Sequence, residues 1–462
     1  MSNLKANVSP RRTASARDGW IARLKAQPGE GPKYLSIAQG LAAAVEAGEL
    51  APGDRLPPQR RVAEALGCDL TTVTRAYAQA REMGLLDGEV GRGTFVRGAA
   101  SPTGPIIDLS MNLPPPAGDE SLRDLIGRGL AATLKNNDPA ALMNYRSGMG
   151  SLRDKRAAAA WLQPLLGDVD PACICVAPGA QAALAALLPM LSRAGDTVLA
   201  EPFTYPGFLA IARLLGVSVA ALQFDDEGPL PDALEVQCKS TRPKAIYLNP
   251  TLQNPTTRTI AAARRDAIIA IARKHDLTIV EDDAYGRFAP NVTPLARLAP
   301  ERVIYVSTLA KCLSPGLRTA FVVAPPALCV RVSEALRAAF LMPVPLLSDM
   351  AVHWIESGVA QRLFNAIAAE SAARMKLARK ILPARARGGA GGFHLWMSLP
   401  PGSSAQAYAA AARAQGVVVV ASQDFAAEAD TEPSVRISLG APPDRETLAR
   451  GLNALADLEK DA

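Results

Sequence analysis

Chemically distinctive side chains gather in five short segments, each of which follows an apolar run of the sequence. The segments are Pro178–Leu184, Glu201–Gly207, Asn249–Thr256, Glu281–Gly286 and Ser307–Arg318. They supply a lysine amine, adjacent carboxylates, an arginine guanidinium and a glycine-led turn that opens a helix. A lysine amine can act as a nucleophile, and the free backbone N–H groups of a helix N-terminus bind anions. Together these groups could bind and react with a charged ligand.

The elements that must position these segments alternate between short strands and alanine-rich helices. The expected strands are Ile174–Val176, Thr197–Ala200, Ala245–Leu248, Thr278–Glu281, Val303–Val306 and Ala320–Val323. This alternation predicts an α/β fold with a mainly parallel sheet covered on both faces. Ligands of such sheets collect at the carboxyl ends of the strands, so the polar loops at those ends are the candidate site.

The order and spacing of the five segments, followed by Ser434–Ser438, are similar to those of fold-type I, pyridoxal phosphate-dependent aminotransferases. The resemblance extends over residues 106–462. It implies pyridoxal 5′-phosphate as the cofactor and a smaller C-terminal subdomain beside the main sheet. One departure is Thr257, which stands where many relatives have glycine after Asn-Pro-Thr.

The resemblance implies a role for residues that contact the ring and aldehyde of the cofactor. Lys311 is expected to be the catalytic residue that forms the Schiff base, because an aldehyde requires an amine nucleophile. Asp282 is expected to face the pyridine nitrogen and keep it protonated, with Asp283 as its alternative. Tyr205 is expected to stack on the ring, with Phe203 as its alternative.

The resemblance also implies partners for the cofactor oxygens and for a substrate carboxylate. Asn254 and Tyr285 are expected to hydrogen-bond the phenolic oxygen. The expected phosphate ligands are the backbone amides of Gly179, Ala180 and Gln181, the hydroxyl of Thr308 with Ser307 as a further candidate, the guanidinium of Arg318, and Tyr145 from the other subunit of a dimer. Arg436 resembles the arginine that binds a substrate carboxylate, for which a planar fork is suited.

The N-terminal region has a different pattern of three helical segments and a hairpin. The expected helices are Leu35–Val45, Gln59–Leu66 and Leu70–Met83, and the hairpin joins Leu85–Leu86 to Thr94–Val96. This pattern predicts a winged helix-turn-helix. Gly53–Ala63, Thr71–Tyr77 and Gly91–Val96 resemble, in that order, the GntR family of bacterial DNA-binding regulators.

A recognition helix presents its N-terminal side chains to bases, and the wing approaches the DNA backbone or minor groove. The candidate DNA-binding residues are Arg60, Thr71, Thr72, Arg75, Arg92 and Gly93. Leu70 stands where many family members have arginine, which removes a candidate contact to guanine. The alternative is a winged helix that serves only protein contacts.

The two regions suggest a winged helix over 30–97, a linker over 98–105 and an aminotransferase-like domain over 106–462. This combination resembles the MocR/GabR subfamily of GntR regulators. The resemblance implies a cytoplasmic, head-to-tail homodimer that binds a double-stranded DNA operator. Its effector would be an amino acid or related amine that forms an external aldimine in place of Lys311. The alternatives are a working aminotransferase with a fused DNA-binding module, and a DNA-binding protein whose cofactor is purely structural.

Composition excludes several other classes of protein. Of the 462 residues, 49% are hydrophobic and 20% charged, which excludes global disorder. The three histidines are far apart in the sequence, so no metal site is expected. The run Ala182–Leu191 is too short to span a bilayer, and no membrane association is expected. The scattered cysteines favour a reducing compartment.

Overall fold

The computed structural model describes residues 19–26, 32–47, 49–50, 54, 56–83, 85–89, 93–96, 106–117, 121–428 and 432–460. The chain divides into two compact units, Met1–Pro105 and Ile106–Ala462. The expected linker at 98–105 and the side chain of Arg92 lie outside the described residues.

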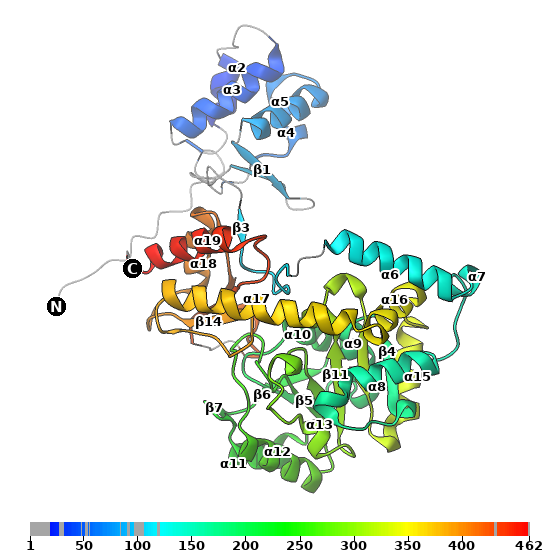
Figure 1. Cartoon of the computed structure of the whole chain (residues 1–462). Coiled ribbons are helices and arrows are strands. Elements are labelled where there is room, and N and C mark those ends of the chain that lie inside the picture. Colours follow the sequence, from blue (N-terminus) through cyan, green and yellow to red (C-terminus); the bar gives the residue numbers. More distant parts are fainter. Residues whose placement is uncertain are drawn as a thin grey trace, which may run out of the picture. The chain divides into compact units, whose positions relative to one another are not determined.

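The N-terminal unit contains a small helical core and an antiparallel hairpin (Figure 1). Its elements are α2 (Gly19–Ala26), α3 (Lys33–Glu46), α4 (Gln59–Leu66), α5 (Leu70–Glu82), β1 (Leu86–Glu89) and β2 (Gly93–Val96). Gly67 joins α4 to α5 in the left-handed conformation with φ of 58°, which glycine adopts without steric cost. The predicted winged helix-turn-helix is confirmed.

The helix α2 was not expected from the sequence, which indicated that the winged helix would begin near residue 30. Trp20 and Ile21 on this helix are buried in the same core as Leu41 and Tyr77. Two large apolar side chains are enough to hold an eight-residue helix that would be marginal in isolation. The N-terminal unit therefore begins to pack earlier than its sequence pattern indicates.

The C-terminal unit is built on a seven-stranded sheet in the order β4-β12-β11-β10-β9-β5-β6. The strands are β4 (Ile174–Ala177), β5 (Thr197–Ala200), β6 (Ser218–Ala221), β9 (Ala245–Leu248), β10 (Thr278–Asp282), β11 (Val303–Thr308) and β12 (Ala320–Val323). All six expected strands are present, and β6 is an additional edge strand. Three of the seven strands, β4, β9 and β11, are buried along their whole length, as expected for a sheet covered by helices on both faces.

Only β12 runs antiparallel to its neighbours in this sheet. The other strands for which pairing is described run parallel to one another. Because β12 is reversed, its first residues lie at the same edge as the carboxyl ends of β10 and β11. The loop that precedes β12 therefore reaches the edge where the sequence predicts the site.

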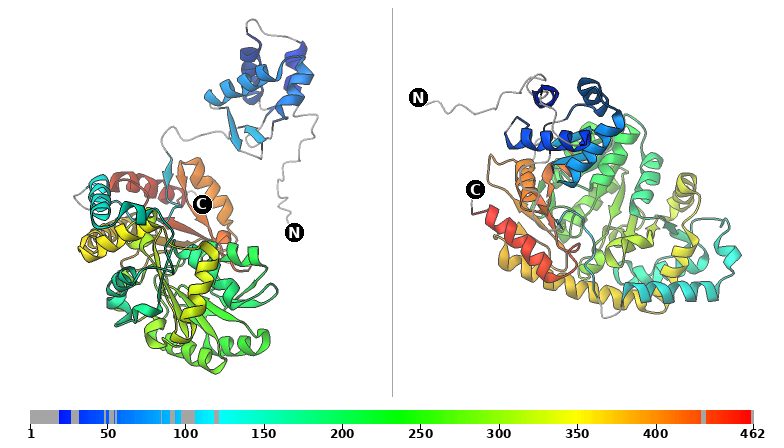
Figure 2. Two further views of the ribbon diagram at one scale, coloured as in Figure 1. Left: turned by 90° about the vertical axis from the view of Figure 1, so that its right-hand side faces the viewer. Right: turned by 90° about the horizontal axis from the view of Figure 1, so that it is seen from above.

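Helices cover the sheet and connect it to a smaller C-terminal sheet. The long helix α17 (Val359–Ile381) runs from α16 (Pro345–Glu356) to α19 (Arg445–Leu458), as Figure 1 shows. Figure 2 shows the orange and red C-terminal elements grouped at one side of the green strands of the large sheet.

The smaller sheet has the order β13-β14-β17-β16 and carries Arg436 on β17 (Ser434–Ser438). Its other strands are β13 (Ala386–Arg387), β14 (His394–Ser398) and β16 (Val420–Ala421), with α18 (Ala405–Ala414) beside it. The predicted α/β fold with a smaller C-terminal subdomain is confirmed. Among the described helices, none is long and apolar enough to cross a membrane.

Replacing Trp20 by alanine tests the contribution of α2. Removal of a buried tryptophan side chain costs about 3–5 kcal/mol, a large share of the stability of a small unit. We expect amide hydrogen exchange in α3 and α5 of the full chain to rise strongly while exchange in β9 and β10 stays unchanged. Lys25→Ala, an exposed change on the same helix, is the control. Unchanged exchange in α3 and α5 of the Trp20 variant would show that α2 does not stabilise the unit.

Candidate functional site

One cavity of about 760 Å³ lies at the carboxyl edge of the large sheet and gathers most of the residues that the sequence singles out. Ten of them line it, namely Ala180, Gln181, Tyr205, Asn254, Asp282, Tyr285, Thr308, Lys311, Arg318 and Arg436. They come from five loops of the large sheet and from β17 of the smaller one. The two sheets therefore build this cavity together.

Gly179 and Arg318 form the part of the cavity that is suited to an anion. Gly179 precedes α9 (Ala180–Leu191), and no side chain caps this helix N-terminus. Its φ of 108° is a conformation that favours glycine, and an added Cβ would lie 2.7 Å from Nη2 of Arg318. Arg318 donates from Nη2 to the Pro178 carbonyl oxygen at 3.2 Å. The glycine thus leaves room for a guanidinium beside uncapped backbone N–H groups, which is a cradle for phosphate.

Lys311 lies on the single-turn helix α14 (Leu309–Cys312) directly after β11. Its Nζ donates to the Asn112 carbonyl oxygen at 2.5 Å. Burial, together with the nearby Arg436, lowers the pKa of Lys311 to about 8, although Asp282 opposes the shift. At pH 7 about 10% of an amine with this pKa is neutral, compared with about 0.03% of an ordinary lysine. The environment therefore favours a nucleophilic amine.

Asp282 and Asp283, the two candidates for the same role, point in different directions. Asp282 lines the cavity, and its Oδ2 accepts a hydrogen bond of 2.7 Å from the Tyr247 hydroxyl. Asp283 accepts a hydrogen bond of 2.8 Å from the Tyr305 hydroxyl in the core instead. Burial raises the pKa of Asp282 to about 6, so a cationic partner in the cavity would stabilise the carboxylate.

Tyr205 and Phe203, the two candidates for covering a ring, have different surroundings. Tyr205 lines the cavity, and its hydroxyl donates to Oε1 of Gln181 at 3.2 Å. Phe203 packs instead against the edge of Trp396, with 5.1 Å between ring centroids. Only Tyr205 of the two is available as a flat surface for a ring in the cavity.

Arg436 enters the cavity from the smaller sheet and is buried. Its Nη1 donates to Oδ1 of Asn254 at 2.7 Å, and its Nη2 donates to the Ser110 carbonyl oxygen at 2.5 Å. The guanidinium also lies over the Phe425 ring, 4.8 Å from the centroid. Its Nε is buried without a partner among the described residues. A carboxylate is the kind of ligand that would satisfy this planar fork.

Several residues of the site were not assigned a role from the sequence. Asn112 donates from Nδ2 to the Tyr285 hydroxyl at 2.7 Å, in addition to accepting from Lys311. Asn249 accepts the backbone N–H of Asn254 on its Oδ1 at 2.8 Å, and its Nδ2 donates to the Asp282 carbonyl oxygen. Asn249 belongs to the segment Asn249–Thr256 that the sequence singles out, whereas nothing in the sequence around Asn112 distinguishes it.

Two threonines of the predicted site have local structural roles. The Thr308 hydroxyl accepts a hydrogen bond of 3.1 Å from the Ala310 N–H and so caps α14, while the neighbouring Ser307 does not line the cavity. Thr257 has a φ of 62°, a left-handed conformation that is costly for a β-branched residue. Glycine adopts this conformation without that cost, so the turn at Thr257 is one that glycine would suit.

Tyr145 does not line the cavity of its own chain. Its side chain is 79% exposed and borders a separate depression beside Arg146. The sequence prediction assigned it to the phosphate of a partner subunit, and that role stays a prediction.

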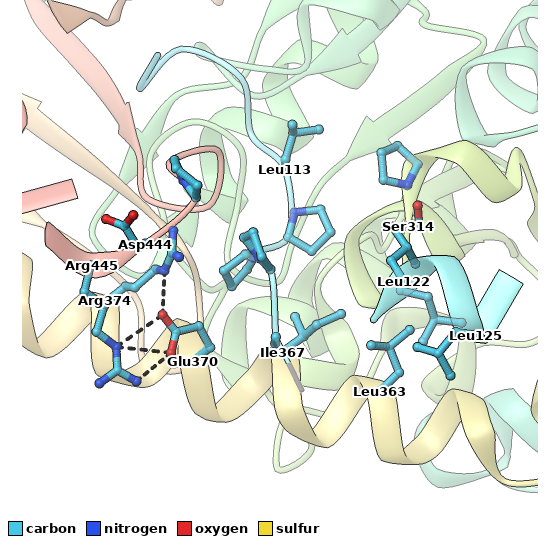
Figure 3. A pocket seen from close by; sticks show the side chains of 17 residues that line it. Leu113, Leu122, Leu125, Ser314, Leu363, Ile367, Glu370, Arg374, Asp444 and Arg445 are labelled. Carbon is cyan, nitrogen blue, oxygen red and sulfur yellow. Dashed lines mark hydrogen bonds and ion pairs between the residues drawn. The ribbon is translucent and has the colours of Figure 1, made fainter. Parts of the chain in front are cut away.

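A second cavity of about 660 Å³ lies beside the first and shares Leu113 and Pro315 with it. Figure 3 shows Leu363 and Ile367 of α17 along one wall. Glu370 lies further along the same helix, and its carboxylate pairs with Arg374 and Arg445. The residues lining this second cavity include none of the candidate site residues.

Four of the candidate DNA-binding residues, Arg60, Thr71, Thr72 and Arg75, lie on α4 and α5. Arg60 and Thr71 are exposed, and Thr72 is half-buried at the start of α5. Arg75 is exposed, and its guanidinium stacks over the Tyr34 ring at 4.5 Å from the centroid. Gly93 begins β2. Basic and hydroxyl groups on two successive helices match the surface that a helix-turn-helix presents to DNA.

The cavity provides the donor set that a phosphorylated aromatic aldehyde requires. An anion cradle, a carboxylate for a ring cation, an aromatic face and an amine of lowered pKa line the same space. The residues present therefore fit pyridoxal 5′-phosphate on chemical grounds.

Comparison with known proteins agrees with this chemistry. Residues 105–455 match the family model of aminotransferase class I and II, and residues 33–96 match bacterial regulatory proteins of the gntR family. The chain is 31% identical over 445 residues to the uncharacterized HTH-type transcriptional regulator YdeF of Bacillus subtilis, covering 94% of this chain and 95% of that protein.

Two solved structures are similar to the C-terminal unit. An archaeal alanine:glyoxylate aminotransferase aligns with a TM-score of 0.71 and 26% identity over 78% of this chain and 92% of that one. The alpha-aminoadipate aminotransferase LysN of Thermus thermophilus, complexed with N-(5′-phosphopyridoxyl)-L-leucine, aligns with a TM-score of 0.69 and 29% identity over 77% and 92% of the two chains.

Both matches to family models agree with the division of the chain into two units. The N-terminal match covers the winged helix, and the C-terminal match covers both sheets and the cavity between them. Pyridoxal 5′-phosphate is the cofactor of the aminotransferase family. The chain belongs to the aminotransferase class I and II family and joins that domain to a gntR-family DNA-binding domain, which is the architecture of the MocR/GabR-type transcriptional regulators.

Proposed function

We propose that this protein is a pyridoxal phosphate-dependent transcriptional regulator that senses an amino acid or a related amine. One observation carries the proposal: a chain with a gntR-family domain also has a cavity lined by both Lys311 and Arg436. An amine that reacts at the cofactor and a carboxylate that binds Arg436 would then be recognised together. Such a regulator would act on a double-stranded DNA operator in the cytoplasm.

The residues of the cavity have distinct tasks in this proposal. When bound, the cofactor supplies an aldehyde for amines and an electron-withdrawing ring. Gly179, with the adjoining backbone amides of α9, and Arg318 hold its phosphate, Asp282 holds a proton on the ring nitrogen, and Tyr205 covers the ring. The Lys311 amine would hold the cofactor at its aldehyde, which is also the position where the amine of an effector would be recognised.

The effector carboxylate, where there is one, binds the guanidinium of Arg436. Arg436 is paired with the Asn254 side chain and the Ser110 carbonyl group. A carboxylate would offer this buried cation a charged partner, which is a stronger interaction than a neutral amide supplies. Binding would therefore change the contacts between the segment after β3 (Ile107–Asp108) and the smaller sheet.

We further propose that the protein acts as a head-to-tail homodimer. Large apolar side chains are exposed around α6 (Leu122–Asn136) and the segment after it, namely Leu122, Ile126, Leu134, Met143, Tyr145 and Leu152. An exposed apolar surface of this kind is typical of a subunit interface. In such a dimer Tyr145 would reach the phosphate of the partner subunit, and each DNA-binding domain would pack on the partner's large domain.

The runner-up function is transamination, which is favoured by the presence of ring, phosphate and amine ligands in one cavity. The two functions differ in the fate of the bound amine. A sensor holds the amine and changes its DNA complex, whereas an aminotransferase releases a keto acid at a rate of about 1 s⁻¹ or more.

Lys311 should carry the cofactor covalently. The purified protein is expected to absorb in the visible range, and borohydride should fix the cofactor to the peptide that contains Lys311. Lys311→Ala should lose this absorbance yet fold normally, because the phosphate contacts remain. Lys376→Ala, an exposed lysine change on α17, is the control. Recovery of the label on any other lysine would disprove the assignment.

Arg60 and Arg92 should contribute to DNA affinity through phosphate contacts. Each lost contact lowers the salt dependence of binding, the slope of log K against log salt, by about one unit. We expect Arg60→Ala and Arg92→Ala to weaken binding to DNA fragments selected with wild-type protein and to leave the cofactor absorbance unchanged. Lys376→Ala removes the same charge from the other unit and should leave the slope unchanged. Equal slopes for the wild type, Arg60→Ala, Arg92→Ala and Lys376→Ala would show that Arg60 and Arg92 do not contact DNA phosphates.

A cognate amine should change the cofactor absorbance and the DNA complex over the same concentration range. A coupling free energy of about 1–3 kcal/mol corresponds to a change in DNA affinity of about 5- to 150-fold. Lys311→Ala should abolish the response while basal DNA binding persists. Arg436→Ala should lower the affinity for an amino acid by about tenfold to 150-fold. The affinity for the corresponding decarboxylated amine should stay unchanged.

The result that rules out the sensor is an amine that shifts the absorbance without altering the DNA complex. Rapid release of keto acid under the same conditions would favour the aminotransferase.

A further inference from the structure

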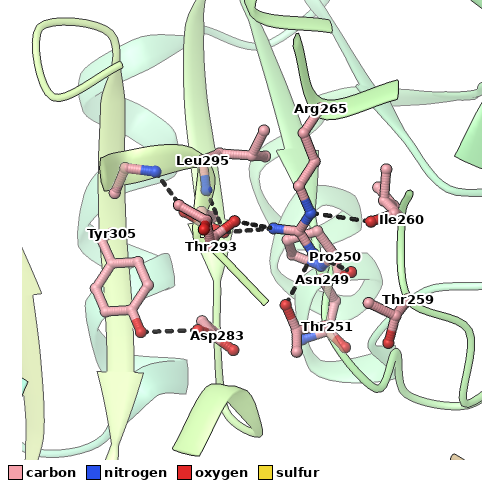
Figure 4. A network of polar contacts seen from close by, with 12 residues as sticks. Asn249, Pro250, Thr251, Thr259, Ile260, Arg265, Asp283, Thr293, Leu295 and Tyr305 are labelled. Atoms are coloured by element: carbon pink, nitrogen blue, oxygen red, sulfur yellow. Dashed lines mark hydrogen bonds and ion pairs between the residues drawn. The ribbon is translucent and has the colours of Figure 1, made fainter. Parts of the chain in front are cut away.

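Arg265 is a fully buried arginine on α12 (Ala262–Lys274), outside the cavity. Its guanidinium lies in a network of polar contacts with the loop after β9 and with β10, shown in Figure 4. Burying a guanidinium is costly unless its donors are satisfied, so the partners of this side chain indicate what it holds.

The first partners of Arg265 are the two ends of the loop that carries Asn254. Its Nε donates to the Ile260 carbonyl oxygen at 3.0 Å, and its Nη2 donates to the Pro250 carbonyl oxygen at 2.7 Å. Nη2 also donates to the Thr251 hydroxyl at 2.9 Å. The loop ends are joined to each other as well, because the Ile260 N–H donates to the same Pro250 oxygen at 2.9 Å. One planar group therefore closes the base of the loop.

The remaining partners connect this loop base to the strand that carries Asp282. Nη1 of Arg265 donates to the Thr293 carbonyl oxygen at 3.2 Å and lies 3.6 Å from Oε1 of Glu281. Glu281 directly precedes Asp282 on β10 and accepts the backbone N–H groups of Leu295 and Ala296 at 3.0 and 2.8 Å. The guanidinium of Arg265 therefore holds the 249–260 loop and the strand β10 together.

The far end of the loop reaches the cavity. Asn254 accepts a hydrogen bond from Arg436, and its own backbone N–H donates to the Asn249 side chain. Asn249 in turn donates to the Asp282 carbonyl oxygen. A displacement of the loop base would therefore shift Asn254 and change its hydrogen bond with Arg436, where the effector carboxylate is proposed to bind.

We propose that Arg265 is a positioning residue for the carboxylate-binding side of the cavity. It acts by clamping the 249–260 loop to β10, which sets the position of Asn254 against Arg436 and of Asn249 against Asp282. The inference rests on the proposed function for the role of Arg436. The clamp itself rests only on contacts between residues of the chain.

A guanidinium is required for this clamp because its donors point in fixed directions within one plane. Lysine keeps the positive charge beside Glu281 but supplies three donors from a single atom, which cannot span both loop ends and Thr293. Arg265→Lys therefore loosens the loop without leaving a buried carboxylate unpaired. Arg265→Ala would leave the buried Glu281 carboxylate without its cationic partner, which would lower the stability of the fold by a larger amount.

Arg264 supplies a matched control on the same helix. Its side chain donates to the Pro229 carbonyl oxygen at 2.9 Å and to Oδ2 of Asp225 at 2.7 Å, and it makes no described contact with the 249–260 loop. Arg264→Lys is the same chemical change at the neighbouring position, so it controls for the loss of an arginine fork on α12.

The first arm of the experiment measures amide hydrogen exchange in cofactor-free protein. Arg265→Lys is expected to raise exchange at the described loop amides of Gln253, Thr257 and Ile260 by about tenfold or more, while Arg264→Lys leaves them at the wild-type rate. Equal protection of these amides in Arg265→Lys and wild type would overturn the clamp. This arm is independent of whether the protein senses amines.

The second arm uses two aminooxy probes on the cofactor-loaded protein. Aminooxyacetate carries a carboxylate and methoxyamine does not, and both react with the cofactor aldehyde and change its absorbance. The wild type and Arg264→Lys should react faster with aminooxyacetate, and Arg265→Lys should lose about tenfold of that preference while reacting with methoxyamine at a similar rate. A retained preference would overturn the positioning role, because a merely structural defect would slow both probes alike. A wild type with no preference would instead count against Arg436 as the carboxylate site, and the exchange arm would still decide the clamp.

Discussion

Burial of charge at one edge of the seven-stranded sheet is the constraint on which the candidate site depends. Asp282 and Arg436 are buried and Lys311 is half-buried, in surroundings where an uncompensated charge costs several kcal/mol. Each is held by hydrogen bonds to a tyrosine hydroxyl, a backbone carbonyl group or an amide side chain. These partners are neutral, so the charges retain a strong preference for a ligand of complementary charge.

The topology of the sheet explains how these groups meet. The parallel strands end at one edge, and the reversed strand β12 brings Arg318 to that edge from the opposite direction. The smaller sheet then adds Arg436, so that a ligand held between the two would contact both parts of the unit. A ligand that draws these parts together is a physical basis for a conformational response, provided that it binds one arrangement more tightly than the other.

Much of this arrangement could be predicted from the sequence because the signals are local. The strands β5, β9 and β12 have the expected bounds, since continuous apolar runs bounded by polar loops are what a doubly covered sheet requires. Residues such as Lys311 and Tyr205 were found because they stand in short polar segments after predicted strands, and the order of those segments resembles a known family. Asn112 and Arg265 were missed because their partners are distant in the sequence and no local pattern marks them. The helix α2 was missed because it depends on the burial of Trp20 rather than on its own helical pattern.

The central claim is that amine binding and DNA binding are coupled, and linkage makes this coupling reciprocal. The most direct measurement is the affinity of a cognate amine, monitored by cofactor absorbance, in the absence and presence of saturating operator DNA. The account predicts that DNA changes the amine affinity by the same factor, about 5- to 150-fold, by which the amine changes the DNA affinity. An amine affinity that is identical with and without DNA would contradict it.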